Sequence, residues 1–301
     1  MSIYLDYQAT TPLAPEARAA MAPWLDEKFA NPHSSHKVGR EAAAAIEVAR
    51  DQIAALLPKG GKLYFTSGAT EALNWALRCA GNPQGGLAIA ATEHAAVRDT
   101  AAWLARSGRT LTDLPVNRDG LIEALPDLAP GTAMVAAMLV NNEIGVIQPI
   151  TPLAAATHQS GGLFLCDAVQ GFGRMPIPDG PDLIAISAHK IHGPKGIGAL
   201  WVRNGVDIAP LLHGGGQEGG LRSGTLSPAL CAGFGAAATS GPAKMLRSNW
   251  TPRSYPDLRS ASGFQRLEDP CHVFTEAFDK HQLAHARTGL LKLSAVEQRA
   301  D

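Results

Sequence analysis

One stretch of the chain decides its fold: Asp182-Leu-Ile-Ala-Ile-Ser-Ala-His-Lys190-Ile-His-Gly-Pro-Lys-Gly-Ile-Gly198. It opens with the apolar run 183–186, which predicts a short buried strand. The hydroxyl of Ser187, the imidazole of His189 and the amine of Lys190 follow at the end of that strand, before a turn rich in glycine and proline. Lysines are mostly exposed, so Lys190 on its own could be an ordinary surface residue.

A hydroxyl, an imidazole and an amine at one strand end suit a ligand that carries both a phosphate and a carbonyl group. Pyridoxal 5'-phosphate (PLP) has both groups, and a lysine amine can hold its aldehyde as a Schiff base. The polar residues that follow other predicted strands favour this interpretation of Lys190 over that of a surface lysine.

Three further predicted strands are apolar and end in polar residues. These residues are His94 after the strand 87–91, Asn142 after 134–140, and Asp167 at the end of 163–167. Helices are predicted between the strands, and this alternation indicates a parallel sheet with right-handed crossovers. Ligands bind beyond the carboxyl ends of such strands, so the polar groups are expected to converge there. Asp167 suits a pyridinium nitrogen, although it could also cap a helix, and His94 could be a structural histidine.

Two turns of the sequence suit a phosphate group. After a strand predicted over 63–66, the segment Ser67-Gly-Ala-Thr-Glu-Ala-Leu-Asn74 predicts a helix whose first N–H groups and dipole attract an anion, and Thr70 adds a hydroxyl. A Ser or Thr shortly before a Glu also caps helices, and the two roles are compatible. The segment 213–225 ends in Arg222-Ser-Gly-Thr225, and its glycines favour a second phosphate-contacting loop over a flexible linker.

Length and composition argue against several classes of protein. The 301 residues suffice for a large core and two domains. The net charge of -1 argues against nucleic acid or an anionic membrane as the main partner, and the apolar runs are too short to span a bilayer. The polar N-terminal residues do not resemble a signal peptide. The four cysteines form no CxxC pair, which is typical of a protein of the reducing cytoplasm and predicts no metal site.

Taken together, the motifs resemble those of cysteine desulfurases in the class V superfamily of PLP-dependent aminotransferases. Eight stretches match in the family's order and at its spacing, from residue 3 to about 238, which makes the set far more specific than any one member. The matching stretches are Tyr4-Leu-Asp-Tyr-Gln-Ala-Thr-Thr-Pro12, Asn31-Pro-His-Ser-Ser-His36, Ser67-Gly-Ala-Thr-Glu71, Thr92-Glu-His94, Val140-Asn-Asn-Glu-Ile-Gly145, Asp167-Ala-Val-Gln170, Ser187-Ala-His-Lys190 and Arg222-Ser-Gly-Thr225.

The resemblance implies a type I PLP-dependent transferase fold, an α/β fold with a mostly parallel central sheet flanked by helices. It implies an N-terminal arm over 1–14 and a PLP-binding major domain over 15–238. The segment 239–301 would be an atypical tail in place of the usual small domain, which would leave that domain incomplete.

The resemblance also implies roles for single residues. Lys190 would be the catalytic Schiff-base lysine that moves the Cα proton. His94 would stack on the pyridine ring and assist this proton transfer as the second catalytic residue. Asp167 would pair with the ring nitrogen, and Gln170 would hydrogen-bond the phenolic oxygen. Thr225 would reach the PLP phosphate in the other subunit of a homodimer. The implied PLP-binding residues are Ala69, Thr70, His94, Asn142, Asp167, Gln170, Ser187, His189, Lys190 and Thr225.

The reaction implied by the resemblance converts L-cysteine to L-alanine. An enzyme thiolate would take the sulfur as a persulfide and pass it to a scaffold protein for iron–sulfur cluster assembly or to another acceptor. Three alternatives within enzymes are a selenocysteine lyase, a cysteine sulfinate desulfinase and an aminotransferase, none of which needs the cysteine nucleophile. A further alternative is an inactive PLP-binding remnant.

The chain departs from the family pattern in its tail. The family carries its nucleophilic cysteine, with an arginine for the substrate carboxylate, beyond the Arg-Ser-Gly-Thr loop, but the resemblance here ends near Ala238. A different reading frame or a replaced C-terminus is one hypothesis for this loss. Cys271 is the tail's only cysteine, and although His272 favours its reactivity, two neighbouring acidic residues oppose it. The other cysteines, Cys79, Cys166 and Cys231, are expected to be packing residues.

Overall fold

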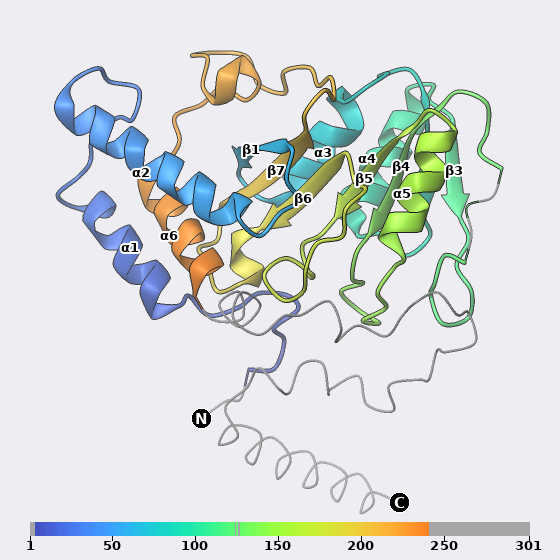
Figure 1. Cartoon of the computed structure of the whole chain (residues 1–301), viewed down its shortest axis with the longest axis horizontal. Helices are drawn as coiled ribbons and strands as arrows, with labels where there is room; N and C mark the ends of the chain where they lie inside the picture. The colour runs from blue at the N-terminus through green and yellow to red at the C-terminus, as the bar shows by residue number, and fades with distance from the viewer. Residues whose placement is uncertain (1–3, 124, 126, 241–301) are drawn as a thin grey trace, which may run out of the picture. The chain divides into compact units, whose positions relative to one another are not determined.

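The computed structural model describes residues 4–123, 125 and 127–240 of the chain (Figure 1). The helices of this part are α1 (Pro15–Leu25), α2 (Lys37–Ala54), α3 (Ala69–Cys79), α4 (Ala95–Arg106), α5 (Ile150–Gln159) and α6 (Pro228–Thr239). The strands are β1 (Gly61–Thr66), β2 (Gly86–Ala90), β3 (Leu111–Leu114), β4 (Thr132–Met138), β5 (Leu163–Asp167), β6 (Leu183–Ser187) and β7 (Gly198–Arg203). Two short 3-10 turns, η1 (Ala188–Lys190) and η2 (Glu218–Gly220), complete the order. Cys271 and the predicted tail from residue 241 onward lie outside the described residues.

All seven strands form one sheet in the order β1-β7-β6-β5-β4-β2-β3. The neighbours from β6 to β3 are parallel, whereas β7 is antiparallel to both β6 and β1, so that β1 again points the same way as β6. The mostly parallel sheet expected from the sequence is confirmed. The turn 191–197 that follows Lys190 is too short for the crossover connection that a parallel strand needs, and β7 therefore returns beside β6 in the opposite direction.

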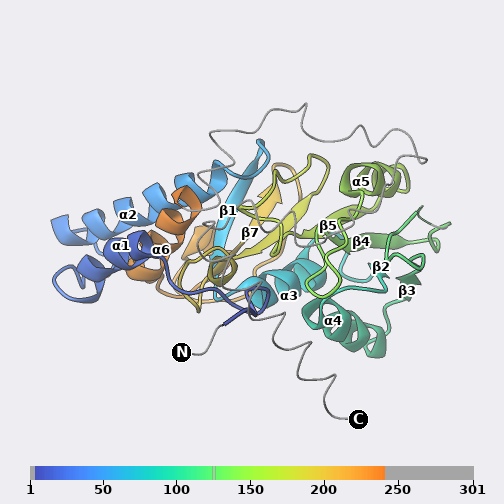
Figure 2. The ribbon, with the colours of Figure 1, turned by 90° about the horizontal axis from the view of Figure 1, so that it is seen from below.

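Alternating side chains on the strands build two apolar layers, one on each face of the sheet. On β4, Met134 and Ala136 belong to the cluster that includes residues of α3 and α4. Val135 and Ala137 face the opposite way, into the cluster that includes residues of α2, α5 and α6. Figure 2 shows α3 and α4 on one side of the sheet and α5 on the other. The strands are apolar on both faces for this reason, as expected of a covered parallel sheet.

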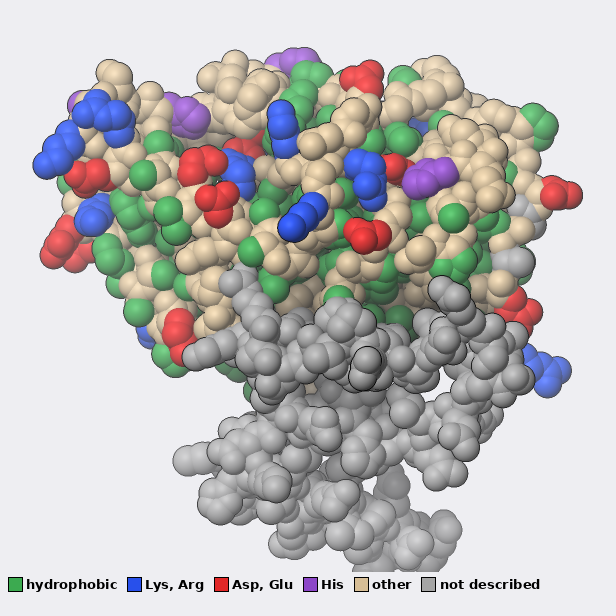
Figure 3. All heavy atoms as spheres, in the orientation of Figure 1, with side chains coloured by type: hydrophobic (Ala, Val, Ile, Leu, Met, Phe, Trp, Pro, Cys, Tyr) green, Lys and Arg blue, Asp and Glu red, His purple; other side chains and the backbone are tan. Residues whose placement is uncertain are grey.

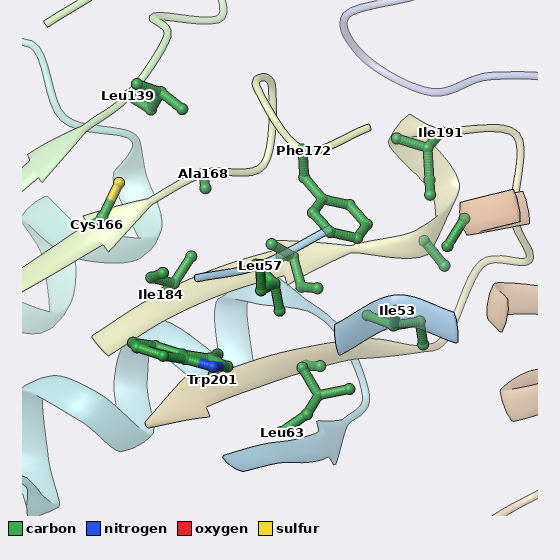
Figure 4. Close-up of a cluster of buried hydrophobic side chains, with 14 of the residues drawn as sticks. Ile53, Leu57, Leu63, Leu139, Cys166, Ala168, Phe172, Ile184, Ile191 and Trp201 are labelled. Atoms are coloured by element: carbon green, nitrogen blue, oxygen red, sulfur yellow. The ribbon is translucent and has the colours of Figure 1, made fainter. Parts of the chain in front are cut away.

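The loop that follows β5 is anchored in one of these layers. The ring of Phe172 is fully buried and meets the ring of Phe234 in α6 edge to face, with centroids 6.1 Å apart and an interplanar angle of 75°. Figure 4 shows Phe172 in the same cluster as Ile184 and Trp201. Burial of such aromatic rings makes the position of the loop well defined.

The element boundaries agree closely with the predicted ones, with one shift that concerns a site residue. The strand predicted over 134–140 lies over 132–138. The chain bends after Met138, and the N–H of Asn141 bonds to the carbonyl of Val146 at 2.9 Å. Asn142 therefore lies in this bend rather than directly at the strand end.

The surface shows no concentration of one charge on the side drawn in Figure 3. Lysine and arginine side chains alternate there with aspartate and glutamate on the atoms that are not grey. None of the described helices is long and apolar enough to cross a membrane.

Candidate active site

The carboxyl ends of β1, β2, β4, β5 and β6 share one edge of the sheet, and the predicted site residues follow them. The turn η1 presents Lys190 at this edge, where its Nζ donates hydrogen bonds to the carbonyl oxygens of Gln8 and Ala9, the latter at 3.0 Å. The neighbouring His189 meets the hydroxyl of Thr10, with 3.1 Å between Nδ1 and Oγ1. The N-terminal arm is thus part of the site, which explains why its sequence stands among the recognisable motifs.

Further hydrogen bonds fasten the arm to the turn after β6. Thr11 donates to the carbonyl of His189 through both its hydroxyl, at 2.8 Å, and its backbone N–H, at 3.0 Å. The Thr11 hydroxyl also accepts from the N–H of His192 at 2.7 Å. Because Thr11 is almost fully buried, these bonds are sheltered from water and hold the arm against the turn.

The surroundings of Lys190 make its neutral amine more accessible than that of an ordinary lysine. Burial lowers the pKa of Lys190, and the nearby guanidinium of Arg174 lowers that pKa further. The carboxylates of Asp167 and Asp6 act in the opposite direction but do not cancel the effect. A neutral amine is the form of lysine that attacks a carbonyl carbon, so Lys190 suits a covalent bond to an aldehyde.

Asp167 places a buried carboxylate at the same edge. It is 4% exposed, and its Oδ1 accepts a hydrogen bond from the N–H of Val169 at 2.9 Å. Burial raises the pKa of Asp167, while the bond from Val169 and the charges of His94 and Lys190 lower it. A buried carboxylate is stabilised when a cation pairs with it, and a protonated ring nitrogen would be such a cation.

Glu93 is a site residue that the sequence did not single out. It lies between two residues of the Thr92-Glu-His94 motif and is 5% exposed. Its Oε1 accepts from the N–H of Met138 at 2.5 Å, while Oε2 has no hydrogen-bond partner among the described residues. Burial and the nearby charge of Asp167 raise the pKa of Glu93 to about 8. At neutral pH Glu93 therefore favours its protonated form, which removes the repulsion between its carboxyl group and that of Asp167.

Replacing Glu93 by glutamine is expected to change how stability depends on pH. The pKa of Glu93 rises from 4.5 to about 8 on folding, so between these values the folded protein keeps a proton that the unfolded chain has released. The free energy of unfolding of the wild type should therefore fall as pH rises through this window, by at most about 1.4 kcal/mol per pH unit. Because Glu93→Gln has no titrating group at this position, its free energy of unfolding should lack this decrease.

Urea unfolding of the full chain from pH 4 to pH 9 would measure this difference. The stability of Glu93→Gln relative to wild type should increase with pH through the window and level off above it. Glu41→Gln, at an exposed helical position, is the matched control and should track the wild type. A pH-independent difference between Glu93→Gln and wild type would contradict the assignment of Glu93 as a buried neutral acid.

Two helix N-termini face the same open cavity, which has a volume of about 300 Å³ and is lined in part by Thr70 and His94. His94 caps α4, because its Nδ1 accepts from the N–H of Ala96 at 3.1 Å. At α3 no side chain caps the first N–H groups, and the Oε2 of Glu71 instead accepts from the N–H of Ser67, before the helix, at 2.7 Å. The first N–H groups of α3, which include those of Ala69 and Thr70, have no partner within the helix and can receive an anion.

Four predicted PLP-binding residues remain: Ser187 ends strand β6, Gln170 and Asn142 follow strands β5 and β4, and Thr225 lies on the separate loop 213–225. Ser187 is buried at the end of β6, and the Nε2 of Gln170 donates to the carbonyl of Gln8 at 2.9 Å. The side chain of Asn142 makes no hydrogen bond within the described part of the chain. Thr225 is exposed, and no described hydrogen bond joins it to another predicted site residue.

Two ion pairs fix the loop that carries Thr225. Arg222 binds Glu71 at the start of α3, with 2.7 Å from Nε to Oε1 and 3.2 Å from Nη2 to Oε2. Glu218 accepts from Arg50 and from the N–H of Phe65, the latter at 2.7 Å. Such bidentate pairs hold a glycine-rich loop in one arrangement, so the segment 213–225 is not a flexible linker.

The three described cysteines are poor nucleophiles. Burial raises the pKa of the Cys79, Cys166 and Cys231 thiols, that of Cys231 to about 12. Because the thiolate is the reactive form, the raised pKa values make these thiols weaker nucleophiles than an ordinary cysteine near neutral pH. Their expected role as packing residues fits their places in α3, β5 and α6.

Comparison with known proteins identifies the family. The family model described as aminotransferase class-V matches residues 3–242. The chain belongs to the aminotransferase class-V family. This class-V chain is 46% identical over 252 residues to a cysteine desulfurase IscS of Rickettsia bellii (strain OSU 85-389), which covers 79% of this chain and 62% of that relative.

Solved structures agree with this assignment. SspA in complex with cysteine is 36% identical with a TM-score of 0.73, over 78% of this chain and 72% of SspA. The NifS-like protein from Rickettsia africae ESF-5 is 32% identical with a TM-score of 0.74, over 83% of this chain and 71% of that protein. These likenesses confirm the predicted α/β fold and the predicted family. The class-V chain spans about 62% of the length of the curated relative that it matches.

Proposed function

We propose that this class-V protein binds PLP and converts L-cysteine to L-alanine, with transfer of the sulfur to an acceptor. The observation that carries the proposal is the meeting of a lysine amine of lowered pKa with a buried carboxylate at one sheet edge, between Lys190 and Asp167. The likeness to relatives named cysteine desulfurase IscS supports L-cysteine as the substrate.

The residues at the edge fit the parts of PLP. Lys190 would hold the aldehyde, Asp167 would pair with the ring nitrogen, and Gln170 would donate to the phenolic oxygen. His94 would stack on the ring, and Asn142 would lie beside the ring and the substrate carboxylate. The phosphate would be held by the first turn of α3 and by side chains of β6 and η1, through Ala69, Thr70, Ser187 and His189. Bound PLP supplies an electron sink for the reaction.

The chain's own groups then have distinct tasks. Once its amine is free, Lys190 would take a proton from the substrate Cα, and the lowered pKa makes its neutral form available for this. Asp167 would keep the proton on the ring nitrogen, and protonated Glu93 would leave Asp167 as the single anion of the pair. The sulfur would pass to an enzyme thiolate. An S–S bond would form while the Cβ–S bond of the substrate breaks and leaves its electron pair on Cβ. Cβ would then take up a proton, and the return of a proton to Cα would complete L-alanine.

The thiol that takes the sulfur is not among the three described cysteines, because their raised pKa values oppose thiolate formation. Cys271 is the one other cysteine of the sequence, and it lies outside the described residues. The raised pKa values also favour a second candidate function, a class-V reaction that needs no enzyme thiol, such as a selenocysteine lyase or a cysteine sulfinate desulfinase.

The proposal includes partners and a compartment. The exposed Thr225, on a loop fixed by Glu71 and Arg50, would reach the PLP phosphate of a second copy in a homodimer. A scaffold protein for iron–sulfur cluster assembly would accept the sulfur, and the cytoplasm would be the site of action. The division into an arm, a major domain and an atypical tail stays a prediction.

A turnover assay on the full chain tests the function. The PLP-loaded protein is given L-cysteine with dithiothreitol, and alanine and sulfide are measured together. We expect both products in equal amounts from the wild type, and a loss of sulfide release with retained PLP in Cys271→Ala. Alanine from cysteine sulfinate or selenocysteine but not from cysteine would favour the second candidate. Bound PLP without turnover of any of these substrates would indicate an inactive remnant.

A further inference from the structure

Arg174 lies in the loop after β5, which follows Asp167 and carries Gln170. The loop is tight, because the N–H of Phe172 bonds to the carbonyl of Ala168 at 2.8 Å and that of Arg174 to the carbonyl of Gly171 at 3.0 Å. With Phe172 buried in the core, the loop has little freedom to move. The side chains on either side of Phe172 therefore start from well-defined positions.

The guanidinium of Arg174 bridges two neighbouring parts of the site. Its Nη1 donates to Oε1 of Gln170 at 3.0 Å, and its Nη2 donates to the backbone carbonyl of Lys190 at 2.7 Å. Within the described residues Arg174 makes no ion pair. Its hydrogen bonds and its charge are thus directed at Gln170 and Lys190 rather than at a carboxylate.

The contact with Arg174 decides which way the Gln170 amide points. A guanidinium has only donors, so the atom of Gln170 that faces it must be the oxygen. The amide NH2 then points away from Arg174 and donates to the carbonyl oxygen of Gln8 at 2.9 Å. The same Gln8 oxygen accepts from the Lys190 amine. The Gln170 NH2 and the Lys190 amine therefore face one point.

We propose, on the basis of the PLP-binding function above, that Arg174 is a positioning residue: it turns the Gln170 NH2 toward the place that the Lys190 amine faces and holds the main chain of Lys190. In PLP the aldehyde and the phenolic oxygen are carried by adjacent ring carbons. An amine and an N–H donor that share one acceptor oxygen lie close enough together to match this pair of groups. A Gln170 amide turned the other way would present an oxygen to the phenolic oxygen and repel it.

Arg174 also acts on Lys190 through its charge. The guanidinium is always protonated in proteins, and it lowers the pKa of Lys190 together with burial. The charged groups that oppose it are Asp167 and Asp6, and His189 next to the lysine has a pKa lowered by burial and by Lys190 and Lys195. Loss of the Arg174 charge should therefore raise the pKa of Lys190.

The first test measures PLP affinity by absorbance titration of the cofactor-free full chain. Arg174→Met should weaken PLP binding roughly tenfold, as expected for the loss of one well-placed hydrogen bond. Gln170→Ala should weaken PLP binding to a similar extent. When Gln170→Ala is already present, adding Arg174→Met should weaken PLP binding less than about threefold further, because the two residues act together. An unchanged affinity in Arg174→Met would overturn the positioning role. A full tenfold loss in the Gln170→Ala background would overturn the positioning of Gln170 by Arg174.

The second test needs no PLP and separates the two proposals. The rate at which an acylating reagent modifies Lys190 is followed by mass spectrometry as a function of pH. Arg174→Met should shift the apparent pKa of Lys190 upward, whereas Arg174→Lys, which keeps the charge, should stay near the wild type. An unshifted Arg174→Met would overturn the action of Arg174 on Lys190. A wild type that takes up no PLP would instead overturn the proposed function, and this profile would still decide the role of Arg174.

Discussion

Replacing Lys190 by alanine is expected to abolish cysteine turnover, with a loss of at least about 10⁴-fold, because one side chain both holds the cofactor and moves the Cα proton. The variant should also lose the visible absorption band of the lysine-bound cofactor. In the part of the chain that the structure describes, Lys190 is the one lysine that combines a lowered pKa with hydrogen bonds to the arm. Alanine and sulfide release, with the absorption spectrum, would measure both losses.

Chemical reduction of the Schiff base would identify which lysine binds PLP. Borohydride reduction of the PLP-loaded wild type, followed by digestion and mass spectrometry, should place the pyridoxyl adduct on Lys190. Lys195→Ala is the matched control, since Lys195 is exposed in the same turn and should leave the adduct in place. An adduct on a different lysine, or a variant at position 190 that keeps the absorption band, would refute the role of this amine.

Replacing Arg50 by methionine is expected to lower the free energy of unfolding by about 3 kcal/mol, the cost of leaving a buried carboxylate without its partner. The side chain of Glu218 is 3% exposed, and Arg50 donates to both of its oxygens, at 2.9 Å and 2.8 Å. Without Arg50, the N–H of Phe65 would be the one remaining donor to Glu218 among the described residues. Urea unfolding of the full chain at neutral pH would measure the change.

Two further variants separate the buried pair from the exposed one. Arg50 also meets Glu47, but that side chain is 63% exposed, so Glu47→Ala should change stability by less than about 1 kcal/mol. In Glu218→Gln the buried charge is gone, and adding Arg50→Met to it should cost much less than Arg50→Met alone. If Arg50→Met lowered the free energy of unfolding equally in the wild type and in Glu218→Gln, the ion pair between Arg50 and Glu218 would not be the cause of the loss. A loosened loop 213–225 should also weaken the proposed homodimer through Thr225.

The local sequence predicted the strands, the helices and the polar residues at the strand ends. The helix over 95–106 and the strand over 163–167 lie where they were expected, because their apolar patterns and end residues are local signals. The meeting of His94, Asp167 and Lys190 followed from one further rule, that parallel strands bring their carboxyl ends to one edge. The helix α6 was not predicted, since its sequence is apolar and small on every side and has no clear period.

The protonation states and orientations of the site residues depend on burial and on contacts between residues far apart in the sequence. The protonation of Glu93 depends on its nearly complete removal from water beside Asp167, and a sequence does not state how deeply a side chain is buried. The orientation of Gln170 depends on Arg174, and the position of the Lys190 amine depends on an arm about 180 residues earlier in the chain. Local sequence patterns therefore sufficed to predict which chemical groups the edge of the sheet would carry. The charges and directions of these groups could be read only from the folded chain, because they depend on neighbours that are distant in the sequence.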